Sequence, residues 1–245
     1  MSRRLVIGDI HGGLRALHQV LEHAKVSTKD TLIFLGDYVD GWSESPQVLD
    51  FLIALSQKQE CIFIRGNHDE LLLDWLLGKT QNFDETMWYK HGGEATVVAY
   101  EKVTPEQKQR HIKFLQSLQD YYLDDTNRLF IHAGFTNLNG IQYEYFPKLF
   151  YWDRTLWETA LALDHSISKE SSLYPKRFTL YEEIYIGHTP VTRIGLTIPF
   201  KKACVWNLDT GAAFKGPLTI MDVDTKIFWQ SVPLHELYFN EKGRN

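Results

Sequence analysis

The sequence predicts an α/β protein built around a parallel β-sheet with helices packed against it. Short apolar runs that end at a glycine alternate with amphipathic segments, as in buried parallel strands joined by helices. The spacing is regular as well, because 28 positions separate Asp9 from Asp37 and 30 separate Asp37 from Asn67. A βαβ unit takes about 30 residues, so the spacing favours consecutive βαβ units.

The first third of the chain alternates between predicted strands and helices. The apolar runs predict strands at 4–7, 31–35 and 61–65. Apolar residues at helical spacing predict helices at 14–24, 45–57 and 69–77. Ser45 is the expected cap of the second helix, with Pro46 at its first position. Asp69 is expected to begin the third, where a negative charge suits the helix dipole.

The rest of the chain changes pattern twice. Residues 78 to 126 are mostly helical, and the clearest helix, at 104–119, has Thr104 as its cap. Two more buried strands are predicted at 128–132 and from 184 onwards, with one helix near 153–163 between them. Short runs after residue 203 predict antiparallel strands. We find no repeat or linker, and expect one domain over 1–245 with a helical, aromatic, cap-like insertion around 78–180.

Composition excludes several classes of protein. The net charge of −5 argues against a strongly electrostatic nucleic-acid binder. Cys61 and Cys204 lie in apolar runs, which favours free buried thiols over a disulfide. No apolar stretch approaches the ~20 residues that span a membrane, and the N-terminal run is too short for a secretion signal. We expect a cytoplasmic protein with no membrane or stable nucleic-acid partner, and its oligomeric state is open.

Five predicted strands run into loops that carry polar side chains. The loops read GDIHGG, GDYVDG, GNHDE, HAG and GHTP, from residues 8, 36, 66, 132 and 187. Ligands of open α/β sheets bind outside the carboxyl ends of the strands. We therefore expect eight side chains to meet at one edge of one sheet: Asp9, His11, Asp37, Asp40, Asn67, His68, His132 and His188.

This set of side chains predicts a metal site. Carboxylates, imidazoles and an amide without a thiolate suit divalent ions such as Mn, Fe or Zn. At least six candidate ligands indicate two ions, and one carboxylate can bridge them through its two oxygens. Two ions about 3.5–4 Å apart can activate a water and neutralise a phosphate oxygen. Singly, each residue has a structural interpretation, since Gly-Asp is a common turn; the prediction rests on the combination.

The five motifs, in this order, resemble the calcineurin-like metallophosphoesterases. They are most similar to the phosphoprotein phosphatase branch, particularly its bacterial serine/threonine phosphatases, and the likeness extends to NLDTGA at 207–212. The resemblance implies two mixed β-sheets sandwiched between helices. It also implies a dimetal site, for which we expect manganese, with iron or zinc as alternatives.

The resemblance further implies a role for each motif residue. Asp9 and His11 would hold one metal, Asp37 would bridge, and Asn67, His132 and His188 would hold the other. A water between the metals would attack phosphorus without a covalent enzyme intermediate. His68 would be the general acid, oriented by Asp40. The chemistry agrees, because a carboxylate bonded to one ring nitrogen favours the protonated imidazole and fixes the ring.

One phosphate-binding feature of the resemblance is missing. In the phosphatase branch an arginine that grips the phosphate follows the second aspartate of GDxVD, and here Gly41 follows Asp40. The stretch YWDRTLW resembles a bacterial segment whose arginine faces the phosphate, so Arg154 is the candidate replacement, beside Asn67. Arg154 could instead pack on Trp152 or Trp157 through a cation–π contact.

Three functions remain open at this point. The first is a phosphomonoesterase of the serine/threonine protein phosphatase type. The second is hydrolysis of a dinucleoside polyphosphate or another small nucleotide or pyrophosphate, favoured by the missing arginine and by aromatic residues in 135–157 that could stack on bases. Those aromatics could equally pack a cap. The third, a non-catalytic metal-binding scaffold, is disfavoured because His68 and Asp40 are both present.

Overall fold

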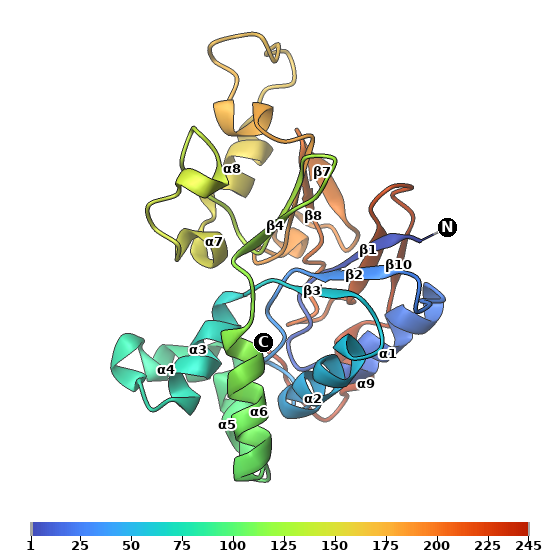
Figure 1. Cartoon of the computed structure of the whole chain (residues 1–245), viewed down its shortest axis with the longest axis vertical. Helices are drawn as coiled ribbons and strands as arrows, with labels where there is room; N and C mark the ends of the chain where they lie inside the picture. Colours follow the sequence, from blue (N-terminus) through green and yellow to red (C-terminus); the bar gives the residue numbers. More distant parts are fainter. Residues whose placement is uncertain (1, 245) are drawn as a thin grey trace.

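A computed structural model describes residues 2–244, within which two five-stranded sheets pack face to face (Figure 1). The first sheet has the order β10-β9-β1-β2-β3, with β1 at Arg4–Ile7, β2 at Thr31–Phe34, β3 at Cys61–Phe63, β9 at Thr219–Asp222 and β10 at Phe228–Gln230. The second has the order β4-β5-β6-β8-β7, with β4 at Tyr121–Leu123, β5 at Arg128–Ile131, β6 at Glu183–Ile186, β7 at Phe200–Lys202 and β8 at Val205–Asn207.

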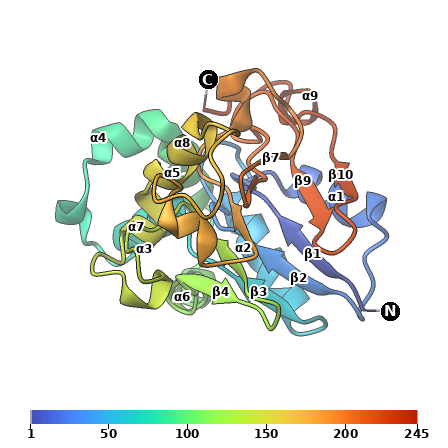
Figure 2. The ribbon, with the colours of Figure 1, turned by 90° about the horizontal axis from the view of Figure 1, so that it is seen from above.

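Both sheets are mixed, as the resemblance implied. Strands β1, β2 and β3 are parallel and lie side by side (Figure 2), while β9 runs antiparallel to β1. In the second sheet β5, β6 and β8 are parallel and the edge strands are antiparallel. The prediction of antiparallel pairing was therefore wrong for β8 against β6. A three-residue strand is too short for its sequence pattern to reveal the direction of its partner.

Alternating side chains divide the core into three layers. In β1, Leu5 and Ile7 face the helices, whereas Val6 faces the other sheet. Between the sheets, the rings of Phe130 and Tyr185 stack with centroids 4.8 Å apart. One face of the first sheet is thus covered by the second sheet, as the resemblance implied, and the other face by helices. An apolar run reports burial on both sides but not which element buries it.

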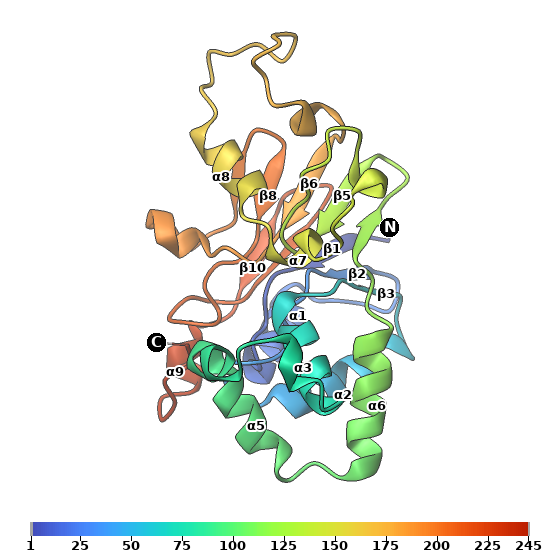
Figure 3. The ribbon, with the colours of Figure 1, turned by 90° about the vertical axis from the view of Figure 1, so that its left-hand side faces the viewer.

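Helices cover the two outer faces (Figure 3). Over the first sheet lie α1 (Leu14–His23), α2 (Ser45–Ser56), α3 (Asn67–Leu76), α5 (Glu94–Tyr100), α6 (Pro105–Gln116) and α9 (Leu234–Leu237). Over the second lie α7 (Leu149–Trp152) and α8 (Thr155–Ala162). The remaining turns are α4 (Glu85–Trp88), a π-helical turn at Tyr89–Gly93, and 3₁₀ turns at Thr80–Asn82, Ile141–Tyr143, Lys176–Thr179 and Val191–Ile194. Thr104 caps α6 in a capping box with Gln107, as predicted.

Residues 78–180, expected as a cap-like insertion, contribute to both halves of the fold. Tyr100 and Phe114 pack into the core under the first sheet, whereas β4 and β5 belong to the second sheet. A cap formed by this range stays a prediction. Cys61 and Cys204 are free thiols, as expected. Within residues 2–244 no helix has the length and apolar character that crossing a bilayer requires.

One ion-pair cluster links the two sheets. Lys226, in the turn between β9 and β10, pairs with Glu183 of β6, and its Nζ also donates to the Tyr185 hydroxyl at 2.6 Å. Glu183 also accepts a bond from the Trp206 indole at 3.1 Å. Burial opposes ionisation of Glu183, but these hydrogen bonds outweigh it and lower its pKa from 4.5 to about 2.

This cluster predicts a loss of stability in acid. Because the folded pKa of Glu183 lies below the unfolded value, its stabilisation is present above pH 4.5 and is lost as the pH falls toward 2. After allowance for solvent screening, we expect about 1 kcal/mol to be lost between pH 6 and 3. Urea unfolding with a chelator present should show this loss in the wild type and a smaller one in Glu183→Gln. Parallel stability curves for the two proteins would contradict the assignment.

Candidate active site

Loops from both sheets converge at one side of the molecule. The first three motif loops follow β1, β2 and β3, and the last two follow β5 and β6. The expectation of one edge of one sheet was therefore wrong, although the convergence itself is present. All eight predicted side chains are buried, none more than 7% exposed: Asp9, His11, Asp37, Asp40, Asn67, His68, His132 and His188.

Asp37 lies at the centre of the cluster. Its Oδ2 is 3.5 Å from Nε2 of His11, and its Oδ1 is 3.4 Å from Nε2 of His132. The two oxygens therefore face two different groups, as a bridging carboxylate requires. Gly66 makes room for this carboxylate, since a Cβ at that position would lie 2.1 Å from Oδ1 of Asp37.

Backbone carbonyls orient two of the imidazoles. Nδ1 of His132 lies 2.8 Å from the carbonyl oxygen of Leu35, and Nδ1 of His11 lies 3.2 Å from that of Val39. A carbonyl can only accept, so each Nδ1 carries a proton, and Nε2 is left to face the cluster. A metal ligand needs this orientation of the ring. Although burial opposes it, the charge of Asp37 raises the pKa of His132 to about 10, so a metal bound by His132 would displace a proton from Nε2.

Asn67 joins the remaining two histidines. Its Oδ1 lies 2.9 Å from Nδ1 of His188 and 3.3 Å from Nε2 of His132. Asn67 is the first residue of α3, which begins two residues before the predicted start at Asp69. The helix N-terminus therefore carries the amide and, one residue later, His68.

Asp69 links two of the loops. Its carboxylate accepts the backbone N–H groups of Gly66 and Asp37 at 2.8 Å each, and that of Tyr38 at 2.9 Å. Asp69 lies in the first turn of α3, where its negative charge interacts favourably with the helix dipole, as expected. Its bonds to the β2 loop go beyond that expectation, because they fix the backbone that carries Asp37.

Unpaired polar atoms show that the cluster fits a cation. Within residues 2–244, Oδ1 of Asp9 and Nε2 of His188 are buried without a hydrogen-bond partner. Such atoms are costly to leave unsatisfied, and a metal ion would satisfy both. Oδ2 of Asp9 accepts the N–H of His188 at 3.0 Å. Two groups of side chains are close enough to hold a metal ion, and both include Asp37. In the first group Asp37 lies with His11 and His68, and in the second it lies with His132 and His188.

The charges in the cluster also favour metal binding. Burial lowers the pKa values of His11 and His188 well below the usual range, so both imidazoles are in the neutral form that binds metals. Burial, followed by the charge of Asp209, raises the pKa of Asp9. A divalent cation would relieve that penalty, because it stabilises the carboxylate form.

His68 forms a hydrogen-bonded pair with Asp40, as predicted from the resemblance. Nδ1 of His68 lies 2.6 Å from Oδ2 of Asp40, and the indole N–H of Trp88 donates to the same oxygen at 2.6 Å. The expected capping role of Ser45 was wrong. Glu44 occupies the N-cap of α2, and the Ser45 hydroxyl accepts the backbone N–H of Asp40 at 3.0 Å instead.

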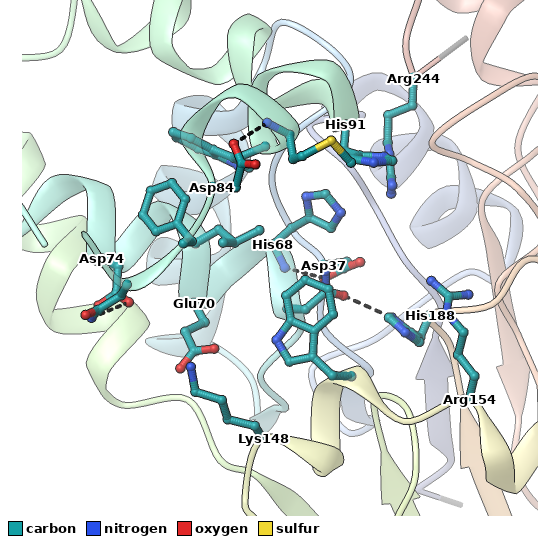
Figure 4. A pocket seen from close by; sticks show the side chains of 17 residues that line it. Asp37, His68, Glu70, Asp74, Asp84, His91, Lys148, Arg154, His188 and Arg244 are labelled. Carbon is teal, nitrogen blue, oxygen red and sulfur yellow. Dashed lines mark hydrogen bonds between the residues drawn. The ribbon is translucent and has the colours of Figure 1, made fainter. Parts of the chain in front are cut away.

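A cavity of about 500 Å³ opens beside the cluster (Figure 4). Asp37, Asn67, His68 and His188 line its inner end. The rest of the lining combines apolar and aromatic side chains with polar and charged ones: Glu70, Leu71, Asp74, Asn82, Phe83, Asp84, Met87, Trp88, His91, Lys148, Trp152, Arg154 and Arg244. Arg154 thus reaches the site, as predicted, and its Nη1 donates to the Thr189 hydroxyl at 3.2 Å.

The family follows from a comparison of the whole sequence with known families. The model of the calcineurin-like phosphoesterases matches residues 2–207. The chain belongs to the calcineurin-like phosphoesterase family. The resemblance seen in the motifs is thereby confirmed, and the Asp and His groups described above are the candidate ligands for the dimetal centre that this family uses.

Curated relatives of this phosphoesterase are nucleotide hydrolases. Proteins named bis(5'-nucleosyl)-tetraphosphatase PrpE [asymmetrical] are 28% identical in Geobacillus thermodenitrificans, over 88% of each chain, and 29% identical in Anoxybacillus flavithermus, over 98% of this chain and 97% of the relative. A symmetrical bis(5'-nucleosyl)-tetraphosphatase of Coxiella burnetii is 33% identical over 53% of this chain and 40% of its own length.

Solved structures share the fold at low identity. A protein proposed to be a diadenosine tetraphosphatase has a TM-score of 0.63 and 19% identity, covering 95% of this chain and 93% of its own. A serine/threonine phosphatase of Saccharomyces cerevisiae has a TM-score of 0.61 and 14% identity, covering 94% and 80%. These likenesses establish the fold of this phosphoesterase alone.

The motifs did not reveal three residues that line the cavity of this phosphoesterase. Trp88, His91 and Arg244 all lie outside every motif. Only the folded chain brings them to the site. Trp88 could not be distinguished by sequence from the other tryptophans, since its contact with Asp40 spans 48 positions.

Trp88 should act as a positioning residue. We expect Trp88→Phe to lower kcat about 10-fold with little change in KM, because Asp40 loses a donor that holds it against His68. Stability should fall by about 1–3 kcal/mol, since a buried carboxylate oxygen loses a partner. Trp75→Phe is the matched control, because Trp75 packs 6.0 Å from Trp88, is only partly buried and does not line the cavity. Equal kcat values for both variants would refute the role.

Proposed function

We propose that this phosphoesterase hydrolyses a dinucleoside polyphosphate. The observation that carries the proposal is the composition of the cavity. Its inner end holds the candidate metal ligands, and its walls offer Phe83, Met87 and Trp152 as apolar surface. Such a site suits a substrate with phosphates at one end and a flat base at the other.

The comparisons support this alternative over the protein phosphatase reading. The relatives that align along most of the chain are named tetraphosphatases. The protein phosphatase reading rests on the motifs, and it is weakened by Gly41 in the place of the phosphate-gripping arginine. A non-catalytic scaffold is disfavoured by the hydrogen-bonded pair of His68 and Asp40.

Different residues of the site would bind the metal ions, carry the proton and bind the phosphate. In this proposal Asp9 and His11 would hold one divalent ion, Asn67, His132 and His188 would hold the other, and Asp37 would serve both. When bound, two such ions supply an activated water and neutralise charge on a phosphate oxygen. His68 carries the proton for the leaving oxygen, and Asp40 fixes the imidazole through Nδ1. Arg154 and the Asn67 amide bind the phosphate.

A substrate panel tests the proposal. The manganese-loaded protein would be given diadenosine tetraphosphate, a phosphoserine peptide and an aryl phosphate, with parallel arms loaded with iron or zinc. We expect kcat/KM for the tetraphosphate to exceed that for the peptide by at least about 10-fold, a difference of about 1.4 kcal/mol. A higher value for the peptide would restore the protein phosphatase reading. No turnover of any substrate would favour the scaffold.

A further inference from the structure

Arg244 enters the cavity from a part of the chain that carries no motif. It follows α9, and its backbone N–H donates to the carbonyl oxygen of Ala213 at 2.9 Å. Its side chain lines the same cavity as His68 and Asp37 (Figure 4). Within residues 2–244, Nε of Arg244 is buried without a hydrogen-bond partner, and no ion pair involves its guanidinium.

Two glycines pack against this side chain. A Cβ at Gly92 would lie 2.9 Å from Cγ of Arg244, which would force a shift, whereas a Cβ at Gly41 would lie 3.4 Å from the same atom, an ordinary contact. The two glycines are themselves joined by a 3.0 Å hydrogen bond from Gly41 N–H to the Gly92 carbonyl. The Arg244 stem therefore fills the space next to the residue that follows Asp40.

The Phe214 ring helps to hold the guanidinium. The guanidinium carbon of Arg244 lies 5.3 Å from the centroid of that ring. A cation–π contact at this distance favours one orientation of the side chain. Arg244 is thus supported along its length by the backbone contact to Ala213, by the glycine pair and by an aromatic ring.

A second arginine shares the cavity without a carboxylate partner. Arg154 reaches in from a different side (Figure 4), and no ion pair within residues 2–244 involves it. Burial lowers the pKa of Arg154, and the charges of Arg193 and Arg244 lower it further. Two guanidiniums that repel each other in one cavity would both be stabilised by a bound anion.

We propose that Arg244, which lies beside Gly41, binds a phosphate group of the substrate, opposite Arg154. Guanidinium groups suit phosphate because their N–H donors match its oxygens in pairs. A phosphoanhydride chain has more than one phosphate, so both arginines can be engaged at once. This choice of substrate class rests on the proposed function, whereas the phosphate contact itself does not.

Equilibrium binding tests the assignment. The probes are a methylene-bridged diadenosine tetraphosphate, which is not hydrolysed at its bridges, and inorganic phosphate, both titrated into manganese-loaded protein by calorimetry. We expect Arg244→Gln to weaken binding of the tetraphosphate by about 10- to 100-fold, as for the loss of a charged hydrogen bond. Arg244→Lys should lose less, because it keeps the charge. Metal content should stay unchanged in both variants.

Arg193→Gln is the matched control. Arg193 is exposed, its charge acts on Arg154, and it does not line the cavity. The affinity of the Arg193→Gln variant for the tetraphosphate should therefore stay within about 2-fold of the wild type. Unchanged affinity in Arg244→Gln, or equal losses in both glutamine variants, would overturn the proposal. If the wild type binds phosphate but not the tetraphosphate, the proposed function fails. The phosphate affinity of Arg244→Gln then decides the role of Arg244: a weaker affinity supports it and an unchanged one refutes it.

Discussion

Replacing Asp37 with asparagine should empty at least one metal position and lower kcat by more than about 100-fold, which is the upper range for losing only a supporting contact. Asparagine keeps the size of the side chain, and its oxygen can still accept the His68 backbone N–H, which Oδ1 of Asp37 accepts at 3.0 Å. The change removes one charge and one of the two oxygens that face His11 and His132. The backbone of the site should therefore survive while the bridge is lost.

Metal analysis after extensive dialysis checks this result. The wild type should retain two ions per chain, and Asp37→Asn should retain one or none. Asp69→Asn is an informative comparison, because Asp69 is buried and bonded to the same loop but belongs to neither ligand group. Asp69→Asn should lower the free energy of unfolding but still retain two metal ions per chain. Two ions retained in Asp37→Asn would refute a bridging role for this carboxylate.

The sequence was informative about this site because its chemistry lies at strand ends. The glycines at 8, 36 and 66 and the regular spacing placed Asp9, Asp37 and Asn67 on neighbouring loops, and the parallel pairing of β1, β2 and β3 confirms that part. His132 and His188 come from the other sheet. Apolar periodicity could not assign them to it, since a strand buried between a sheet and helices has the same pattern as one buried between two layers of helices.

Supporting contacts were beyond the reach of the sequence for a different reason. Trp88 meets Asp40 from the end of α4, just before a π-helical turn in which Gly92 has φ +101°. Arg244 reaches Gly41 only after the chain has passed through both sheets. Neither contact leaves a local pattern. The sequence showed that glycine stands in place of the arginine after Asp40. It did not show that Arg244 packs beside this glycine.

The geometry around His68 is compatible with two roles, a metal ligand and a general acid. A ring nitrogen of His68 is close enough to His11 and Asp37 to complete a ligand group. A carboxylate bonded to Nδ1, as Asp40 is, supports metal ligands and general acids alike. The resemblance favours the acid. The two roles differ in which substrates suffer when the imidazole is removed, and this difference can be measured.

His68→Ala should lower kcat by about 10²- to 10⁴-fold for phosphate esters of alkyl alcohols and far less for aryl esters. An alkoxide needs a proton as it leaves, whereas a stabilised phenolate departs without one. Across a series of esters, log kcat should therefore depend more steeply on the pKa of the leaving group in the variant than in the wild type, with two ions still bound. Asp40→Asn should change the slope in the same direction, because the imidazole loses the carboxylate that fixes its orientation through Nδ1. A loss of metal with an unchanged slope would make His68 a metal ligand. The proton would then have to come from another group in the cavity, and His91 is the other imidazole outside the metal cluster that lines it.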